Sequence, residues 1–217
     1  MDDELSGSLG VTAPYPGARM RLVTIEGVEL RRTSCDALRT AGIQDTDPVS
    51  ESDVHEAIDE AEPEAAMNRA LRLLGHRERS VQELVGRLAR DGYPDAVIAP
   101  VTERLLDYGY LDDARFAHGY VRSKHAAGWG RTRIAKGLAD KGVEPIIAAN
   151  ALDAVAPGCG EVERARASIR GLDTFDRAGE SRALRRLVYR GFSYEVARAA
   201  LEAHRADYEG DDMTSQS

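Results

Sequence analysis

The chain has 217 residues, of which 42% are hydrophobic, 6% aromatic and 30% charged, and its formal net charge is −8. This length is enough for one or two domains with cores of their own. Two cysteines are too few for a disulfide framework, which excludes small secreted scaffolds. The chain has no run of 18 apolar residues, the length needed to span a bilayer, which excludes membrane-spanning proteins. The acidic N-terminus lacks a signal-peptide layout, so we expect a cytoplasmic protein.

The charge is unevenly distributed along the chain. Residues 1–65 carry 15 acidic and 5 basic side chains, whereas residues 66–206 carry 18 acidic and 24 basic ones. Four more acids follow from Asp207 onward. A basic body between acidic ends favours a polyanionic partner, and the alternative is a solvated surface with acidic ends that aid solubility.

The first 65 residues contain the only β-rich pattern. Arg21–Arg32 reads as two short strands around Glu26-Gly27, which predicts a hairpin. Ser34 is a candidate cap for a short helix ending near Gly42, and Ser52-Asp53 is the candidate start of another helix through Ile58. An isolated hairpin is marginal in water, so it must pack on these helices or on the body.

A unit of about 50 residues recurs three times after residue 66. Each copy places a leucine four residues before a glycine and an apolar residue directly after it: Leu88…Gly92-Tyr93, Leu138…Gly142-Val143 and Leu187…Gly191-Phe192. The glycines lie 50 and 49 residues apart, and further apolar residues recur at fixed offsets from them. Such a period is typical of stacked units that mainly contact their neighbours, which predicts an elongated body.

Each copy reads as three short helices. In the first, Ser80 and Glu83 form a capping box, and Gly92 suits the left-handed residue that ends a helix. In the second, Asp112 is a candidate cap, and Gly128 and Gly130 break the helical pattern. We therefore predict a mainly α fold in which three tandem three-helix repeats follow a small β-hairpin-plus-helix extension. The predicted boundaries are a disordered acidic start (1–18), the extension (19–65), the repeats (66–111, 112–158 and 159–207) and a disordered acidic tail (208–217).

The sequence contains no recognisable catalytic motif. The nearest phosphate-loop candidate, Gly128-Trp129-Gly130, is followed by Arg133 where a third glycine is needed. The adjacent Asp112 and Asp113 do not face each other on a helix, so they cannot share a proton as a catalytic dyad does. We predict no catalytic residue, no metal site and no cofactor.

Basic side chains recur on the polar faces of equivalent helices in the second and third repeats. Such faces can follow a phosphate backbone, and the helix start at residues 130–132 offers backbone N–H donors for phosphates. Solvated amphipathic faces are the alternative, because the chain uses 26 arginines and 3 lysines throughout. Trp129 is expected to fill a junction between helices, with base stacking as the alternative. The candidate contact residues are Arg122, Lys124, Arg131, Arg133, Lys136, Arg182, Arg185, Arg186 and Arg190.

About 135 residues of the body resemble the RecX family of bacterial regulators of RecA recombinase. The block from Gly109 to Ala117, GYLDDARFA, is the most specific part of this resemblance. The motif positions that the resemblance marks as structural are Ser80, Glu83, Gly109, Tyr110, Leu111, Asp112, Asp113, Phe116, Gly130, Gly142, Gly191 and Phe192. The first 65 residues are also similar to the hairpin-plus-helix extension found in some members of this family.

The resemblance implies a regulator that is not an enzyme. Such a protein binds RecA and the RecA–single-stranded-DNA filament and restrains ATP hydrolysis, strand exchange and filament growth, in homologous recombination and DNA repair. We also expect a monomer that binds single-stranded DNA, with duplex DNA as a weaker partner, and that does not bind membranes. Two other readings remain: a stand-alone regulator whose helix from Arg131 to Lys141 enters a duplex groove, and a helical-repeat adaptor that binds only protein.

Overall fold

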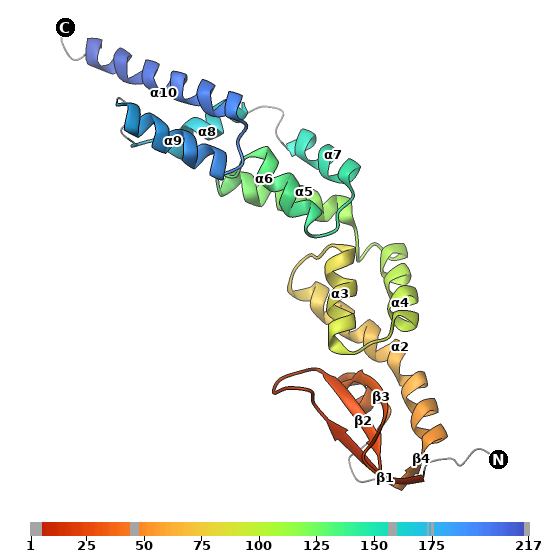
Figure 1. Cartoon of the computed structure of the whole chain (residues 1–217). Helices are drawn as coiled ribbons and strands as arrows, with labels where there is room; N and C mark the ends of the chain where they lie inside the picture. Colours follow the sequence, from red (N-terminus) through yellow and green to blue (C-terminus); the bar gives the residue numbers. More distant parts are fainter. Residues whose placement is uncertain (1–5, 44–47, 156–159, 173, 175, 215–217) are drawn as a thin grey trace. The chain divides into compact units, whose positions relative to one another are not determined.

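The computed structural model divides into two compact units, which we call the N-terminal unit (Met1–Asp112) and the C-terminal unit (Asp113–Ser217) (Figure 1). It describes residues 6–43, 48–155, 160–172, 174 and 176–214. The N-terminal unit contains β1 (Ser6–Thr12), β2 (Met20–Ile25), β3 (Val28–Ser34), α1 (Cys35–Thr40), β4 (Pro48–Ser50), α2 (Glu51–His76), α3 (Val81–Asp91) and α4 (Asp95–Asp107). The C-terminal unit contains α5 (Asp113–Ala126), α6 (Arg131–Ala139), α7 (Pro145–Val155), α8 (Glu161–Ile169), α9 (Arg177–Tyr189) and α10 (Tyr194–Thr214).

The strands form one antiparallel sheet in the order β3-β2-β1-β4. Strands β2 and β3 are the predicted hairpin, and both residues of its turn, Glu26 and Gly27, have positive φ, as a tight hairpin turn requires. Ser34 caps α1, because its hydroxyl accepts a hydrogen bond of 2.9 Å from the Ala37 N–H. The mainly helical fold with a small N-terminal sheet is therefore confirmed.

The prediction of disorder at the two ends is wrong for the described residues there. Ser6–Thr12 forms β1, which pairs with both β2 and β4, and α10 continues to Thr214. The glycines of β1 have low strand propensity, but a Cβ on Gly7 would overlap Glu26 of the hairpin turn, and a Cβ on Gly10 would overlap Thr24 of β2. Tertiary pairing, which composition cannot register, therefore outweighs local preference.

Helix α2 is much longer than predicted. It begins after Ser50, whose hydroxyl accepts a hydrogen bond of 3.2 Å from the Asp53 N–H, and it runs unbroken to His76. The predicted boundary between residues 65 and 66 therefore lies inside this helix. Pro63 is exposed, and the buried face continues on both sides of it through Ala61 and Ala65. This alanine-rich face packs closely against its neighbours, which stabilises a helix whose propensity is interrupted.

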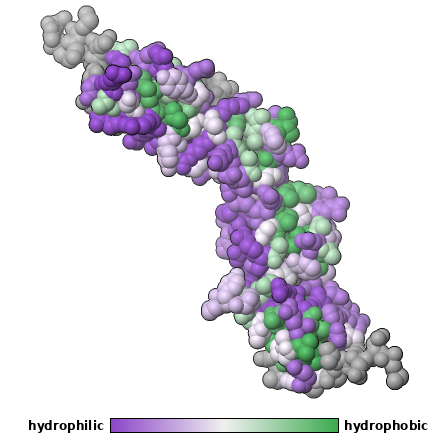
Figure 2. Space-filling view, in the orientation of Figure 1, coloured by the Kyte–Doolittle hydropathy of each residue, from purple (hydrophilic) through white to green (hydrophobic). Residues whose placement is uncertain are grey.

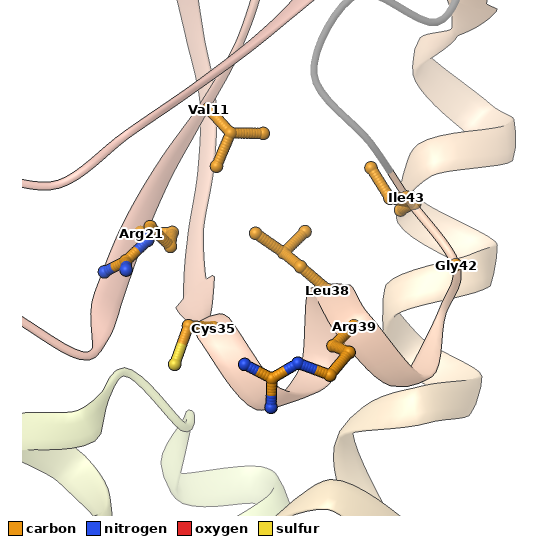
Figure 3. A pocket seen from close by; sticks show the side chains of 7 residues that line it. All are labelled: Val11, Arg21, Cys35, Leu38, Arg39, Gly42 and Ile43. Atoms are coloured by element: carbon orange, nitrogen blue, oxygen red, sulfur yellow. The ribbon is translucent and has the colours of Figure 1, made fainter.

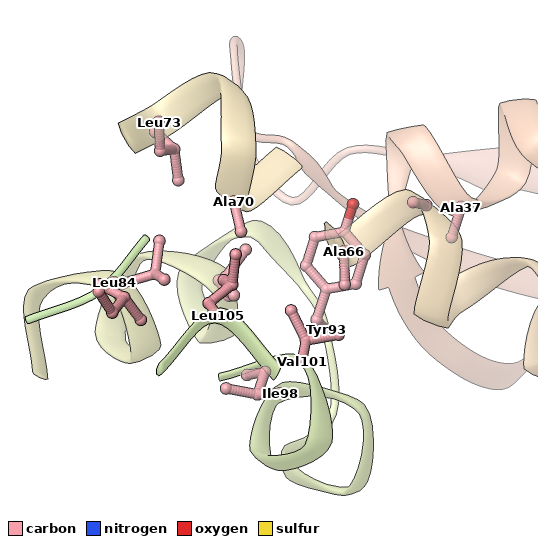
Figure 4. Close-up of a cluster of buried hydrophobic side chains, with 12 residues drawn as sticks. Ala37, Ala66, Ala70, Leu73, Leu84, Tyr93, Ile98, Val101 and Leu105 are labelled. Carbon is pink, nitrogen blue, oxygen red and sulfur yellow. The ribbon is translucent and has the colours of Figure 1, made fainter. Parts of the chain in front are cut away.

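The larger hydrophobic core of the N-terminal unit lies among α2, α3 and α4, and a second, smaller cluster joins the sheet to α1 and α2. Figure 4 shows side chains from these helices, with Tyr93 among them and Ala37 of α1 nearby. Burial raises the pKa of Tyr93 to about 12. A Cβ on Gly92 would lie 2.6 Å from the Thr33 carbonyl oxygen, so the end of α3 closely approaches the end of β3. The sheet and the first three-helix group therefore pack as one body.

The three copies of the sequence repeat adopt the same local structure. In each copy the leucine is fully buried, the glycine has positive φ, and the next residue donates its N–H to the leucine carbonyl at 3.1–3.2 Å. This arrangement ends α3, α6 and α9 with a left-handed residue and brings the following apolar side chain back into the core. The repeat therefore follows from a recurring helix end: Leu88-Gly92-Tyr93, Leu138-Gly142-Val143 and Leu187-Gly191-Phe192.

Candidate nucleic-acid interface

The basic excess of the body belongs to the C-terminal unit. Residues 66–112 carry seven acidic and seven basic side chains, whereas residues 113–206 carry 11 acidic and 17 basic ones. All nine predicted contact residues lie in the C-terminal unit, on α5, α6 and α9 or directly after α9. On the face shown in Figure 2, hydrophilic residues predominate and apolar ones form small separate patches.

Backbone hydrogen bonds join the start of α6 to the end of α9. The Gly130 N–H donates to the Arg190 carbonyl at 2.8 Å, and the Thr132 N–H donates to the Gly191 carbonyl at 3.1 Å. These bonds join unpaired donors at a helix N-terminus to unpaired acceptors at a helix C-terminus. A Cβ on Gly130 would overlap the Gly191 backbone, so the close approach requires glycine there.

This junction corrects one expectation from the sequence. The N–H groups of residues 130–132 were expected to be available for phosphates, but the Gly130 and Thr132 groups bind α9, and the Arg131 N–H donates to the Glu161 carboxylate at 3.1 Å. The helix start instead fixes the positions of the side chains around it.

A cluster of cations and aromatic rings lies beside the junction. The Arg133 guanidinium carbon is 4.1 Å from the Trp129 ring centroid and 5.0 Å from that of Tyr189. The Lys124 ammonium is 4.6 Å from the Trp129 centroid and 5.2 Å from that of Tyr120. Cations at these distances are attracted to the ring faces. We call these five residues the basic-aromatic cluster.

A hollow of about 400 Å³ opens next to this cluster. Gly137 forms part of its wall, and a Cβ there would overlap the Tyr120 hydroxyl. The Lys141 ammonium is 5.8 Å from the Tyr120 ring centroid. The hollow is lined by Tyr120, Trp129, Arg133, Lys136, Gly137, Asp140 and Lys141, so cations outnumber its single acid.

Five of the predicted cations are exposed and have no hydrogen-bond or ion-pair partner within the described part of the chain. They are Arg122, Lys136, Arg182, Arg185 and Arg186. Arg182, Arg185 and Arg186 precede Tyr189 by seven, four and three residues, which places all four side chains on one face of α9. The arginine face of α9 is therefore continuous with the basic-aromatic cluster through Tyr189.

Besides Lys124 and Arg133 of the basic-aromatic cluster, two predicted cations have partners inside the protein. Arg131 pairs with the exposed Asp153 at 2.7 Å. Arg190 is half-buried rather than outward-facing, and its guanidinium contacts the Gly128 carbonyl at 3.4 Å and the Ser168 hydroxyl at 3.3 Å. Arg190 therefore helps to join α9 to its neighbours.

Tyr189, Tyr120 and Lys141 contribute to this surface although they are not among the predicted contact residues. Trp129 does fill a helix junction as predicted, since it packs against the core of α5–α7, yet two cations also lie over its ring. The spacing of Tyr189 from the arginines of α9 is a usable signal for the first of these residues. The contacts of Tyr120 and Lys141 depend on tertiary packing.

His125 adds no charge to this surface at neutral pH. Its burial, together with the nearby Arg164 charge, lowers the pKa of the imidazole below its ordinary value of 6.5.

The N-terminal unit contains a second hollow, of about 430 Å³ (Figure 3). Its side chains include Cys35 and two arginines, but both arginines already have partners. Arg21 donates to the Ala18 and Met20 carbonyls, and Arg39 pairs with Asp36 at 3.0 Å. This hollow therefore presents no uncommitted cation, which sets it apart from the surface of the C-terminal unit.

Comparison with known proteins identifies the family. The profile described as "RecX, first three-helix domain" matches residues 66–105, and "RecX, second three-helix domain" matches residues 112–152. The "Regulatory protein RecX" of Halorhodospira halophila is 36% identical over 151 residues, which cover 69% of this chain and 94% of that protein. The chain belongs to the RecX family.

Other RecX proteins agree over different lengths. The protein of Chromohalobacter salexigens is 37% identical over 137 residues, covering 61% of this chain and 88% of the relative. That of Mycolicibacterium smegmatis is 42% identical over 108 residues, covering 49% of this chain and 57% of the relative. These relatives are named regulatory proteins, which supports a regulatory role for this member of the RecX family.

Solved RecX structures share the fold. The crystal structure of RecX from Lactobacillus salivarius has a TM-score of 0.59 and 22% identity, covering 67% of this chain and 97% of that chain. A second crystal structure of a regulatory protein RecX has a TM-score of 0.59 and 20% identity, covering 89% of this chain and 98% of that chain.

The RecX motif residues hold helix ends and junctions together. Gly109 has positive φ after α4, Leu111 is buried, and Phe116 packs in the core of the C-terminal unit. The Ser80 hydroxyl accepts the Glu83 N–H at 3.1 Å, while the Glu83 carboxylate binds Arg77. Tyr110, by contrast, is exposed. None of the helices in the described part of the chain is long and apolar enough to cross a membrane.

Proposed function

We propose that this RecX protein binds RecA and the RecA–single-stranded-DNA filament, and restrains its ATP hydrolysis, strand exchange and growth. The observation that carries the proposal is the surface on which four of the unpartnered cations, Lys136, Arg182, Arg185 and Arg186, adjoin the basic-aromatic cluster. The cytoplasmic location and monomeric state predicted from the sequence belong to the same proposal.

The surface suits a nucleic-acid backbone for an electrostatic reason. Guanidinium groups that lack carboxylate partners give up no ion pair when they bind phosphates, and they release the counterions condensed on DNA. Single-stranded DNA also offers unpaired bases to aromatic rings. Cations and rings next to each other therefore favour a single strand over a protein-only partner.

The geometry argues against the reading in which α6 enters a duplex groove. Helices that read a major groove place their first residues on the base edges. The backbone at the start of α6 is bonded to the end of α9, and Arg131 and Arg133 are engaged with Asp153 and the aromatic rings. Lys136 and Thr132 are the exposed α6 side chains that remain for contact with base edges.

The test measures DNA-dependent ATP hydrolysis by RecA while this protein is titrated below stoichiometry. We expect the rate to fall at far fewer molecules than RecA protomers. The variant Lys136→Glu/Arg182→Glu/Arg186→Glu should inhibit weakly. It should also flatten the salt dependence of single-strand binding by about 0.7 log–log units for each phosphate that the variant no longer binds.

A matched control reverses three exposed arginines of the N-terminal unit: Arg32→Glu, Arg90→Glu and Arg104→Glu. This variant has the same net charge as the test variant but keeps the proposed surface, so it should inhibit like the wild type. Equal loss in both variants would mean that net charge matters and the surface does not. No inhibition by the folded wild-type protein would contradict the proposal itself, and salt-insensitive filament binding would favour the protein-only adaptor.

A further inference from the structure

Tyr189 is an exposed aromatic side chain held beside a cluster of cations. It is 77% exposed, the highest value among the large hydrophobic side chains that are exposed in the described part of the chain. A side chain this exposed buries little apolar area, so it contributes little to the stability of the fold. Its position therefore calls for a reason other than core packing.

The environment of Tyr189 holds its ring in a defined place. The Arg133 guanidinium lies over the ring at 5.0 Å and also contacts the Tyr189 carbonyl oxygen at 3.3 Å. The same guanidinium lies 4.1 Å from the half-buried Trp129 ring, which packs against the core of α5–α7. Arg133 thus links the exposed ring to a fixed one.

The backbone adds a second restraint. The two hydrogen bonds between the start of α6 and the end of α9 fix the distance between Arg133 and Tyr189. A Cβ on Gly191 would overlap the Arg133 side chain, so the two segments are in close contact here. A tyrosine has only two side-chain torsions, and little further entropy is lost when such a ring is covered.

We propose that Tyr189 is a stacking platform for one unpaired base of a single strand, while Arg182, Arg185 and Arg186 bind the neighbouring phosphates. This inference rests on the proposed function and assigns the base contact within it. The exposed ring surface accepts the base, and Arg133 on the ring is a positioning residue. Any base has a stacking face, so the site should tolerate sequence.

The experiment compares two single strands of equal length and charge, an oligothymidylate and the same backbone without bases. Affinity is measured on the full chain by fluorescence anisotropy at several salt concentrations. Loss of one base–aromatic stack costs roughly 5- to 150-fold in affinity. We therefore expect the wild-type protein to prefer oligothymidylate by a factor in this range.

The variants assign this preference to the ring. Tyr189→Ala should remove most of the preference for bases and leave the salt dependence unchanged, because the phosphate contacts remain. Tyr189→Phe should keep the preference. The matched control is Tyr194→Ala, which removes another tyrosine of the C-terminal unit that is 61% exposed and should behave like the wild type.

The other outcomes separate this inference from the proposed function. Equal binding of both strands by a wild-type protein that still inhibits RecA would overturn the stacking platform alone. Binding of neither strand nor the filament would overturn both proposals. If Tyr189→Ala weakens filament binding but keeps the preference for bases, the ring contacts protein, and the stacking assignment is wrong.

Discussion

The two units of this RecX protein use arginine in opposite ways. In the N-terminal unit, arginines bind buried carboxylates: Asp91 contacts Arg69 at 2.7 Å and Arg87 at 3.3 Å, and Glu62 contacts Arg31 at 3.3 Å. The described part of the C-terminal unit buries no carboxylate, and its arginines lie at helix junctions or on the surface. A count of basic residues therefore overstates the charge available to a ligand in the N-terminal unit.

The different use of arginine follows from the contacts that join the helices and strands within each unit. The sheet, α1 and α2 share a hydrophobic cluster, and ion pairs add a link to α3, because Arg19 contacts both Asp36 and Asp91. The two three-helix groups of the C-terminal unit, α5–α7 and α8–α10, meet mainly through glycine and backbone hydrogen bonds, to which the Arg190 side chain adds contacts with Gly128 and Ser168. Where the backbone makes the contact, the charged side chains remain available for a partner.

The largest expected effect comes from removing a buried carboxylate of the N-terminal unit. Asp91→Ala leaves Arg69 and Arg87 without their partner, and breaking a buried ion pair costs about 3–5 kcal/mol. Hydrogen exchange of peptides from α3 and α4 measures the loss.

The control for this variant is Asp153→Ala in the C-terminal unit, which breaks the exposed pair with Arg131. We expect a change of about 0–1 kcal/mol there, because solvent screens exposed pairs. Similar losses in the two variants would contradict the proposed difference between the units.

A smaller effect is expected where backbone contact holds the C-terminal unit together. Gly130→Ala places a Cβ against the Gly191 backbone, which cannot yield as a flexible side chain can. Overpacking of this kind costs about 1–3 kcal/mol. Urea unfolding followed by the fluorescence of Trp129, the chain's single tryptophan, measures the loss.

Gly86→Ala is the matched control, because nothing lies within 4 Å of the added Cβ and Gly86 is inside α3. It should stabilise the N-terminal unit by about 0.5–1 kcal/mol through helix propensity. Because Trp129 lies in the C-terminal unit, the stability of the Gly86→Ala variant is measured by hydrogen exchange of α3 peptides. A stable Gly130→Ala variant would show that the junction between α6 and α9 is loose.

The smallest effect concerns the response of the N-terminal unit to acid. Burial of Asp36 favours the protonated form, but the hydrogen bond from Arg19 and the charges of Arg19, Arg72 and Arg39 outweigh it and lower the pKa below 3.8. The folded unit then binds fewer protons than the unfolded chain. Asp36 therefore contributes stability above pH 3.8 that is lost as the pH falls through the lowered pKa.

Glu62 has the opposite sign, because burial outweighs the Thr33 hydrogen bond and the Arg31 charge and raises its pKa above 4.5. Its contribution is present below pH 4.5 and is lost as the pH rises through the raised pKa. Asp36→Asn should weaken the loss of N-terminal stability between about pH 5 and pH 2. Glu62→Gln should make this loss steeper. Hydrogen exchange of α2 peptides at each pH measures both slopes, and equal slopes in the two variants would refute the assignment.

Some parts of the molecule were predictable because the signals are local. The turn at Glu26-Gly27, the cap at Ser34 and the glycine that ends the middle helix of each repeat all follow from backbone conformations that few residues tolerate. The three-fold recurrence of such an end revealed the helical repeat. The surface position of Arg182, Arg185 and Arg186 followed from helical periodicity.

Other parts depend on residues that are distant in the sequence. Strand β1 forms because β2 and β4 supply its hydrogen bonds, and α2 continues past residue 65 because its alanine face is covered on both sides. The donors of residues 130–132 are occupied because α9 ends against α6. No pattern within a single segment carries this information.

The amino-acid sequence by itself determined the helical repeat, the family and the outward arginines of α9, because each depends on spacing along one segment. Only the tertiary structure decided which cations are free to bind a ligand. Arg133, Arg190 and Arg131 look alike in sequence, yet one lies over two rings, one contacts a carbonyl and a hydroxyl, and one pairs with a carboxylate. A long side chain binds the groups that tertiary packing places within a few ångströms of it, and these groups come from elements that are distant in the sequence.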